Sequence, residues 1–229
     1  MNKTKYFCAL VVLVVSSAAV LCRADEPVTF GDIHGGLIVQ LGAGKTDEAI
    51  RLAGTGRYIV HLLDTDPVRV EKARAALKAS GLYGLAFAEE LTDPARLPYS
   101  ENVVNGVFVR SPGKVGLVEI FRVMTPLGAL EGSGEARLDV KLAGKAGFAT
   151  ILSEADGSLK AKKPWPGNMD TWSHPRHGAS GNAVSLDTAV GPPERVRWVA
   201  AAMSEVEGLI TDGGRNFYGG VLARDSFNG

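Results

Sequence analysis

Residues 35–44 decide the fold of this chain: Gly35-Gly36-Leu37-Ile38-Val39-Gln40-Leu41-Gly42-Ala43-Gly44. Here an apolar run ends in a glycine-spaced turn, and a helix-like segment follows. A second apolar run, from Tyr58 to Leu63, closes with Asp64. A buried strand, a glycine turn, a helix and a strand that ends in an acid are typical of the first half of a nucleotide-binding α/β unit. Glycine lets the backbone approach a ligand closely, and a carboxylate about twenty residues further on can accept hydrogen bonds from ribose hydroxyls.

The amino terminus carries a separate signal. Lys3 and Lys5 precede an apolar stretch that begins at Phe7, and the small residue Ala24 is suited to cleavage. This pattern predicts a secretory signal peptide over residues 1–24, and therefore an exported, periplasmic or secreted protein that meets a membrane only through that segment. An uncleaved membrane anchor is the alternative, although the apolar run is short for a membrane span.

Cysteine usage and charge limit the classes of function. Both cysteines, Cys8 and Cys22, lie in the signal segment, so we expect the mature chain to be stabilised by packing without disulfides. A lipoprotein site at Cys22 is disfavoured, because Leu21 is larger than the small residue expected before such a cysteine. The 25 basic and 25 acidic residues balance. The basic cluster at 160–163 is too small to indicate nucleic acid as a partner.

Strand and helix patterns alternate after the first motif. They predict strands at 36–41, 58–63, 85–88 and 103–109, and helices at about 46–53, 67–80 and 117–124. Thr46 and Pro67 suit the starts of the first two helices. This alternation predicts an α/β fold, a Rossmann-like, mostly parallel sheet with helices on both faces. We expect 125–128 to stop the third helix and 136–150 to form a poorly covered hairpin.

The pattern changes near residue 160. Short strand patterns follow at 195–199, 208–211, 216–218 and 221–225, with a tight turn at Gly213 and Gly214. We therefore expect one domain over residues 25–160, then a linker and an incomplete all-β segment over 161–229. The dipeptide Asn228-Gly229 favours a turn that a further strand would follow, so we expect the chain to be the opening of a larger β structure.

Four motifs between residues 35 and 130 resemble those of class I S-adenosylmethionine-dependent methyltransferases. They are Leu41-Gly42-Ala43-Gly44, Leu63-Asp64-Thr65-Asp66-Pro67 running into Val70-Glu71-Lys72-Ala73-Arg74, Leu97-Pro98-Tyr99-Ser100-Glu101-Asn102-Val103-Val104-Asn105, and Glu119-Ile120-Phe121-Arg122-Val123-Met124-Thr125-Pro126-Leu127-Gly128. The resemblance implies S-adenosylmethionine as the cofactor. It implies that Gly42 and Gly44 approach the methionine part of the cofactor. It also implies that Asp64 binds the ribose hydroxyls and that Asp93 binds the adenine amino group.

The chain departs from this family's pattern at several positions. Gln40 stands where an acid is common, and Asn105 replaces an aspartate. Lys45 and Thr46 replace an acid and the third glycine. Lys45 also brings a positive charge near the sulfonium of the cofactor, which Coulomb repulsion disfavours. No base on the acceptor side is evident where strand 103–109 ends, so the sequence names neither a catalytic residue nor a methyl acceptor.

The whole chain also resembles a narrower group, large secreted bacterial proteins that join a methyltransferase-like domain to a β-propeller of the pyrroloquinoline-quinone type. The resemblance is carried by Lys163-Pro164-Trp165-Pro166, Asp170-Thr171-Trp172-Ser173-His174, Ser180-Gly181-Asn182-Ala183-Val184-Ser185-Leu186-Asp187, Val190-Gly191-Pro192-Pro193 with Trp198, and Ala223-Arg224-Asp225-Ser226-Phe227-Asn228-Gly229. In that group asparagine is ordinary at the position of Asn105. A propeller needs about four blades or more to close, so one partial blade implies missing blades and no quinone binding by this chain.

Two functions stay open at this point. The first is an S-adenosylmethionine-dependent methyltransferase domain with an unknown acceptor. The second is a catalytically degenerate scaffold or binding module on an exported propeller protein. Export favours the second, because the charged cofactor is made in the cytoplasm. A dinucleotide-dependent oxidoreductase is a weaker third hypothesis, because the third glycine of Gly-x-Gly-x-x-Gly is absent.

The linker offers a weak indication of a metal site. Asp170, His174 and His177 are zinc-ligand types, but no further strong ligand accompanies them, so we expect no metal. The alternative is a polar linker in which Trp165 and Trp172 pack on the first domain.

Overall fold

The computed structural model describes residues 28–229 except 112, 190, 192–195, 200–207 and 220–221. The predicted signal peptide, residues 1–24, lies outside the described residues. Within the described part, every helix is too short or too polar to cross a membrane.

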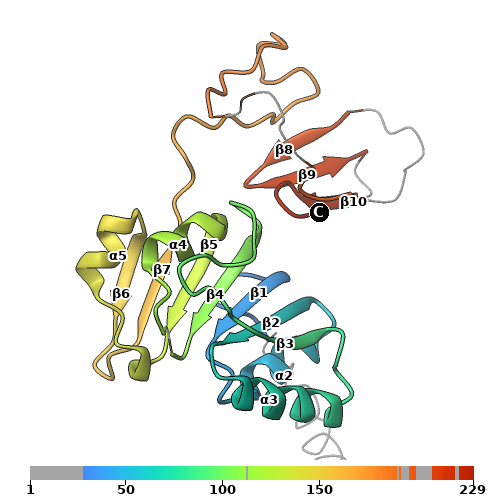
Figure 1. Ribbon diagram of the computed structural model, residues 1–229. Helices are drawn as coiled ribbons and strands as arrows, with labels where there is room; N and C mark the ends of the chain where they lie inside the picture. Colours follow the sequence, from blue (N-terminus) through green and yellow to red (C-terminus); the bar gives the residue numbers. More distant parts are fainter. Residues whose placement is uncertain (1–27, 112, 190, 192–195, 200–207, 220–221) are drawn as a thin grey trace, which may run out of the picture.

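A seven-stranded sheet forms the larger part of the molecule, in the order β3-β2-β1-β4-β5-β7-β6 (Figure 1). Its strands are β1 (Gly36–Leu41), β2 (Tyr58–Asp64), β3 (Ala86–Glu90), β4 (Val104–Val109), β5 (Met124–Gly132), β6 (Ala149–Ser153) and β7 (Leu159–Lys162). Strands β1 to β5 are parallel, and β7 runs antiparallel between β5 and β6. The order reverses between β1 and β4, and ligands of open α/β sheets bind at the carboxyl ends beside such a reversal.

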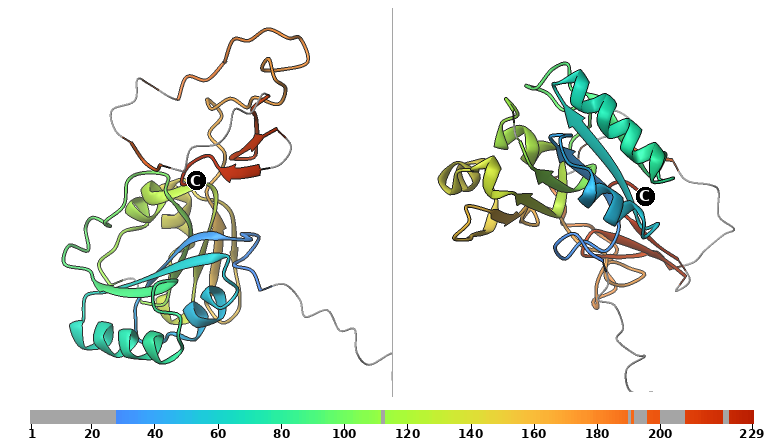
Figure 2. Two further views of the ribbon diagram at one scale, coloured as in Figure 1. Left: turned by 90° about the vertical axis from the view of Figure 1, so that its right-hand side faces the viewer. Right: turned by 90° about the horizontal axis from the view of Figure 1, so that it is seen from below.

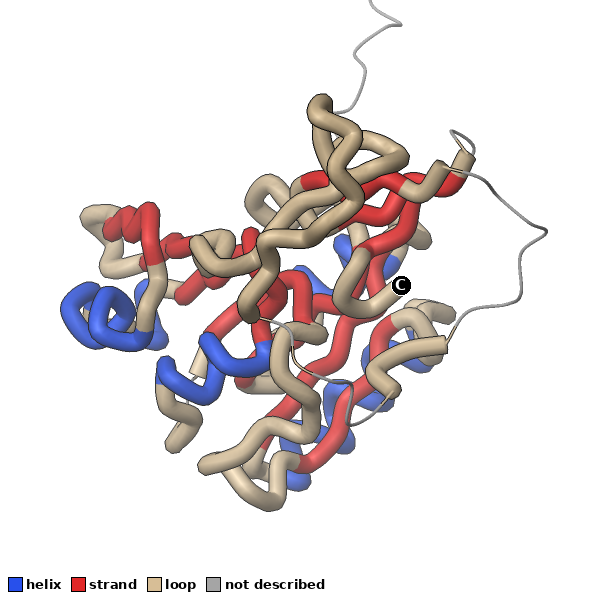
Figure 3. Tube along the Cα trace, turned by 90° about the horizontal axis from the view of Figure 1, so that it is seen from above, coloured by secondary structure: helices blue, strands red, loops and turns tan. Residues whose placement is uncertain are grey.

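Helices cover both faces of this sheet, as the sequence predicted (Figures 2 and 3). Helices α2 (Asp47–Ala53) and α3 (Pro67–Ala79) pack against one face, and α4 (Leu117–Val123) and α5 (Val140–Ala146) against the other. Neighbouring residues of β1 serve the two cores, since Ile38 packs with α2 and α3 while Val39 packs with α4. A strand buried on both faces reads as a continuous apolar run, which is the pattern of 36–41.

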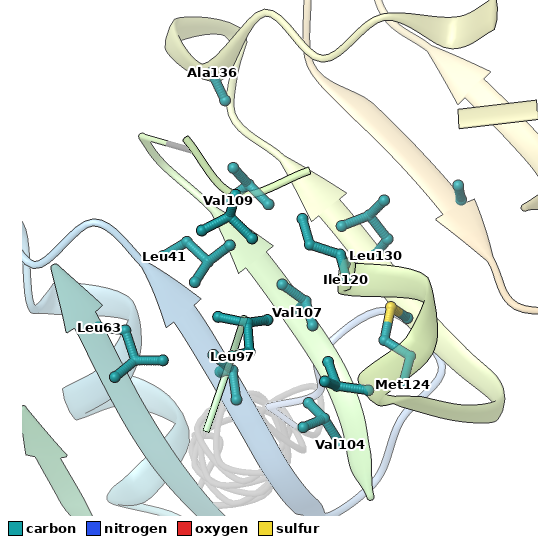
Figure 4. Close-up of a cluster of buried hydrophobic side chains, with 14 of the residues drawn as sticks. Leu41, Leu63, Leu97, Val104, Val107, Val109, Ile120, Met124, Leu130 and Ala136 are labelled. Carbon is teal, nitrogen blue, oxygen red and sulfur yellow. The ribbon is translucent and has the colours of Figure 1, made fainter. Parts of the chain in front are cut away.

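The core on the α4 face joins strands, helix and loop (Figure 4). Its labelled members are Leu41, Leu63, Leu97, Val104, Val107, Val109, Ile120, Met124, Leu130 and Ala136. On the other face, the central glycine of β4 has a packing role. A Cβ at Gly106 would lie 2.7 Å from the Phe30 ring and 2.8 Å from Ile38 Cδ1. The glycine therefore lets Phe30 lie directly on the strand.

The expectation for 125–128 was incomplete. This segment does end helix α4, but it lies within β5, a nine-residue strand that the sequence analysis missed. The β4–β5 register shifts between Val104 and Gly106, which leaves an irregular stretch in which Leu127 has a φ of 63°. Pro126 falls in this irregular stretch, where its missing N–H costs no ladder hydrogen bond.

The hairpin predicted for 136–150 is wrong. Most of this segment forms the 3-10 helix η1 (Gly134–Ala136) and helix α5. Asp139 caps α5 by accepting hydrogen bonds from the backbone N–H groups of Lys141 and Leu142, and Gly147 ends it with a φ of 107°. The exposed lysines of this short helix gave the sequence its strand-like alternation. The hairpin lies later, in β6 and β7, and β7 continues two residues past position 160.

The carboxyl-terminal part contains a three-stranded antiparallel sheet of β8 (Ile210–Asp212), β9 (Arg215–Tyr218) and β10 (Leu222–Asp225). Gly213 and Gly214 form the predicted turn with φ values of 53° and 77°. The strand predicted at 195–199 is wrong for residues 196–199, which form no strand, and residue 195 lies outside the described residues. Arg197 there pairs instead with Glu101 at 2.9 Å.

The small sheet docks at the amino end of the large one (Figure 1). Asn105 of β4 donates through Nδ2 to Asp225 Oδ2 at 2.9 Å, and its Oδ1 accepts from Leu37 N at 2.9 Å and from Asn228 Nδ2 at 2.6 Å. Asn228 Nδ2 also donates to Val103 O at 2.7 Å. The departure from aspartate at position 105 thus has a structural use, because an amide can donate and accept at once.

Candidate functional site

The backbone bend after β1 is held by its neighbours. Gly42 has a φ of 98°, and its N–H donates to Leu63 O at 2.8 Å. A Cβ at Gly42 would lie 3.0 Å from Ser111 N, at the end of β4. Glycine is therefore required at position 42 by the left-handed conformation and by the close approach of β4, whether or not a ligand binds.

Gln40 explains a second departure from the family pattern. Its side chain is buried, and its Nε2 donates to Gly42 O at 2.7 Å and to Lys45 O at 2.8 Å. Gln40 thereby fixes both ends of the bend. A carboxylate at this position could not donate to two carbonyl oxygens.

Asp64 lies directly on the bend. Its Oδ2 accepts from Ala43 N at 2.7 Å, and its Oδ1 accepts from Asp66 N at 3.0 Å. The side chain of Asp64 is only 4% exposed. The structure therefore brings together the predicted residues Gly42, Gly44 and Asp64 at the carboxyl ends of β1 and β2.

Arg69 covers this carboxylate, and the sequence analysis missed it. Arg69 Nε donates to Asp64 Oδ2 at 2.8 Å and Nη2 donates to Asp64 Oδ1 at 2.7 Å, which is a bidentate ion pair. Burial alone would raise the pKa of Asp64, but the hydrogen bonds from Arg69, Ala43 and Asp66 outweigh it and lower the pKa. An arginine five residues after the strand-end acid was the available signal, since the first turn of α3 lies beside the end of β2.

Further charges surround the bend. Lys45 Nζ lies 3.5 Å from Glu135 Oε1 of η1, and both side chains are well exposed. This acid partly offsets the positive charge that disfavours a sulfonium. Arg110, at the end of β4, lies over the Phe108 ring at 4.7 Å. The expected cap at Thr46 is not formed, because its side chain makes no capping hydrogen bond.

Asp93 lies apart from the Asp64 contacts, in the loop after β3. It is exposed, and its Oδ1 accepts from Ala95 N at 2.9 Å within the same loop. The loop is anchored further on, where Leu97 N donates to Glu119 Oε1 at 2.7 Å. The adenine role of Asp93 stays a prediction.

A buried histidine lies on β2 before Asp64. His61 Nδ1 lies 2.5 Å from the Tyr99 hydroxyl, and the ring stacks on Phe87 with 4.3 Å between centroids. Burial lowers the pKa of His61 to about 4, so the ring is neutral at pH 7. His61 is a buried residue in the middle of β2. It does not lie at the carboxyl ends of the strands, where a cofactor would bind.

Two of the linker residues that suggested a metal, Asp170 and His177, are hydrogen-bonded to each other. Asp170 Oδ2 accepts from His177 Nε2 and from Leu186 N, each at 2.7 Å. Across residues 28–229, apart from the gaps named above, no group of three His, Cys, Asp or Glu side chains could hold a metal ion. Trp165 packs edge-to-face on Phe227, and Trp172 lies 5.0 Å from the His177 ring. These tryptophan contacts lie within the carboxyl-terminal part and not on the first domain.

Two cavities lie at the amino end of the sheet. One, of about 850 Å³, is lined by residues that include Asn102, Trp165, Asp212 and Phe227. The other, of about 720 Å³, is lined by residues that include Gly36, Asn105 and Asp225. The first lies mainly between the linker and the small sheet, and the second lies between the large sheet and the docked small sheet.

Comparison with known proteins finds likeness at the level of solved structures. No protein-family model and no curated protein matches the sequence. The chain is similar to the cyclase SpnF, with 19% identity and a TM-score of 0.45 over 52% of this chain and 53% of that one. It is similar to a SAM-dependent methyltransferase from Aquifex aeolicus, with 18% identity and a TM-score of 0.43 over 56% and 81% of the two chains.

A SAM-dependent methyltransferase from Methanosarcina mazei is similar at 14% identity and a TM-score of 0.45, over 58% of this chain and 94% of that one. The matched part therefore spans just over half of SpnF and most of the Methanosarcina protein.

Proposed function

We propose that the carboxyl end of the large sheet binds S-adenosylmethionine. One observation carries the proposal: the Asp64 carboxylate accepts a hydrogen bond from Ala43 N at 2.7 Å, in the middle of the glycine bend. A carboxylate fixed there can accept hydrogen bonds from both ribose hydroxyls, and the two glycines of the bend carry no side chain that would keep the rest of the cofactor away. Gly42 and Gly44 would approach the methionine part, and Asp93 would approach the adenine.

The cofactor would supply an activated methyl group, since its sulfonium carbon is already electrophilic. The protein then needs mainly to position the acceptor. The described residues after β4, Arg110, Ser111 and then 113–116, place no evident general base beside the bend. We therefore propose methyltransferase-like cofactor binding and name no acceptor and no catalytic residue.

The location of the protein is a second part of the proposal. The sequence of residues 1–24 predicts export through a cleavable signal peptide. An exported protein meets little of a cofactor that is made in the cytoplasm. The alternative, a non-catalytic module, therefore predicts that the chain does not bind S-adenosylmethionine.

Calorimetric titration tests this proposal on the full chain, with S-adenosylmethionine and S-adenosylhomocysteine as probes. We expect binding by the wild type and loss of binding in Asp64→Ala. The matched control is Glu90→Gln, because Glu90 is an exposed acid beside Asp64 in the β2–β3 register. Unchanged affinity in Asp64→Ala would contradict the ribose role. Absence of binding by folded wild type and by folded Arg69→Met together would favour the non-catalytic module.

A further inference from the structure

Asp64 already has its acceptor positions filled by its own chain. Each of its two oxygens accepts one backbone hydrogen bond, from Ala43 N or from Asp66 N, and one from Arg69. An ionised carboxylate has about four acceptor positions. In this structure none remains for a ribose diol.

We propose that Arg69 closes the Asp64 site, and that cofactor binding requires Arg69 to leave Asp64 and pair with Asp66. This proposal rests on the proposed function. It assigns to Arg69 a role in selecting and admitting the ligand, since the guanidinium and the ribose compete for the same two oxygen positions.

The four partners of Asp64 are not equally free to leave. The N–H groups of Ala43 and Asp66 belong to the bend and to the turn before α3, so they stay wherever the fold stays. The side chain of Arg69 is 47% exposed, while that of Asp64 is 4% exposed. Arg69 therefore lies between a buried carboxylate and solvent, and rotation of its side chain alone uncovers the two oxygens.

The position of Arg69 also blocks the bend itself. A Cβ at Gly44 would lie 3.7 Å from Arg69 Cδ, so the arginine stem lies just beyond the space that a side chain at position 44 would occupy. A ligand that approaches the backbone of Gly44 would meet this stem. One movement thus opens both the carboxylate and the glycine surface.

Asp66 provides a place for the displaced guanidinium. Arg69 Nη1 already lies 3.4 Å from Asp66 Oδ2, and the Asp66 side chain is 37% exposed. Asp66 Oδ1 accepts from Val68 N at 2.9 Å as the cap of α3, which keeps the carboxylate in place. The arginine can therefore exchange one carboxylate for another without leaving the site as an unpaired charge.

The test measures S-adenosylhomocysteine affinity, because this probe has a neutral sulfur and so does not sense the charge of Lys45 through a sulfonium. Arg69→Met keeps most of the stem and removes the competing donors. We expect about two- to threefold tighter binding, the size of effect that removal of a half-exposed ion pair allows. Arg51→Met is the matched control, because Arg51 is 44% exposed, pairs with Glu48 on α2, and should leave affinity unchanged.

Two further measurements separate competition from a general effect of charge. Asp66→Asn keeps the helix cap but removes the alternative partner, so we expect about threefold weaker binding. Added salt screens ion pairs, so we expect it to tighten binding by the wild type and to leave Arg69→Met unaffected. Arg69→Gln replaces Arg69→Met if circular dichroism shows that the methionine variant does not fold.

The outcomes are distinct. Equal or weaker affinity in a folded Arg69 variant than in the wild type would overturn the role of Arg69 and leave the proposed function standing. Loss of binding in every variant, with folded protein, would overturn both.

Discussion

The two ends of the large sheet use buried polar side chains in opposite ways. At the carboxyl end, a charged carboxylate is held by two backbone N–H groups and by one exposed, removable side chain, Arg69. At the amino end, the neutral amide of Asn105 is held by two segments distant in sequence, one at Leu37 and one that contains Asp225 and Asn228. One end can be opened by rotating a side chain, and the other only by detaching the small sheet.

The difference separates the proposed ligand site from the surface on which the small sheet docks. The cavities of about 850 and 720 Å³ lie at the amino end, where polar groups are already paired within the chain. The carboxyl end has a displaceable partner on a buried charge.

The largest expected effect is at the amino end. Asn105→Ala would remove the three buried hydrogen bonds that Asn105 makes with Leu37 N, Asp225 and Asn228, and we expect the free energy of unfolding to fall by about 4 kcal/mol. Urea unfolding measures the loss, and limited proteolysis should show the small sheet cut first. A loss below 1 kcal/mol, on the order of an exposed polar contact, would show that Asn105 does not hold the docked segment.

The loss of stability in mild acid should come mainly from His61, in the middle of β2. The pKa of His61 is lowered from 6.5 to about 4 in the folded state, so the unfolded state binds its proton first. Stability is fully present above pH 6.5 and should fall by about 3 kcal/mol as the pH is lowered from 6.5 to 4. Urea unfolding at several pH values measures this, and His61→Gln, which keeps an acceptor for Tyr99, should flatten the profile. If His61→Gln loses stability in acid as the wild type does, groups other than His61 cause the loss.

Removal of the Asp64 carboxylate, at the carboxyl end of the sheet, should lower the free energy of unfolding by less. Asp64→Ala deprives the N–H groups of Ala43 and Asp66 of their acceptor, while Arg69 can be hydrated, so we expect a loss of about 2 kcal/mol. Because the folded pKa of Asp64 is depressed, its contribution is present above its unfolded pKa of 3.8 and is lost as the pH falls through the lower folded value. Asp64→Ala should therefore differ least from the wild type in strong acid. A constant difference at all pH values would contradict the ion pair.

Substitution of Arg69, the exposed partner of Asp64, should have the smallest effect on the free energy of unfolding. Arg69→Met removes a half-exposed ion pair, and we expect the free energy of unfolding to change by about 0.5 kcal/mol. Thermal unfolding beside Arg51→Met measures it. A loss as large as that of Asp64→Ala would mean that Arg69 is part of the framework and is not free to move.

The sequence was sufficient where structure is set locally. Strand 36–41, helix 67–80 and the strand that ends in Asp64 follow from apolar runs and from Pro67, whose signals lie within each element. Strand β5 was missed because Pro126 and the positive φ of Leu127 belong to an irregular register that only pairing with β4 defines. The placement of Asp64 on the bend followed from topology, since parallel strands end at one edge.

The contacts of Gln40, Arg69 and Asn105 could not be predicted from local sequence signals. The two donors of Gln40 find carbonyls at 42 and 45 only once the bend has its three-dimensional shape. Arg69 meets Asp64 across a strand-to-helix turn, a spacing that no helical or strand period describes. Two partners of Asn105, Asp225 and Asn228, lie more than one hundred positions away in the chain, beyond any local pattern.

That separation has a consequence for biosynthesis. Asn105 leaves the ribosome long before Asn228, which lies 123 positions later. At about 5–20 residues per second, the interval is on the order of ten seconds. Until Asp225 and Asn228 emerge, the Val103 carbonyl oxygen and the Asn105 amide nitrogen that they later join can pair only with water or with a chaperone.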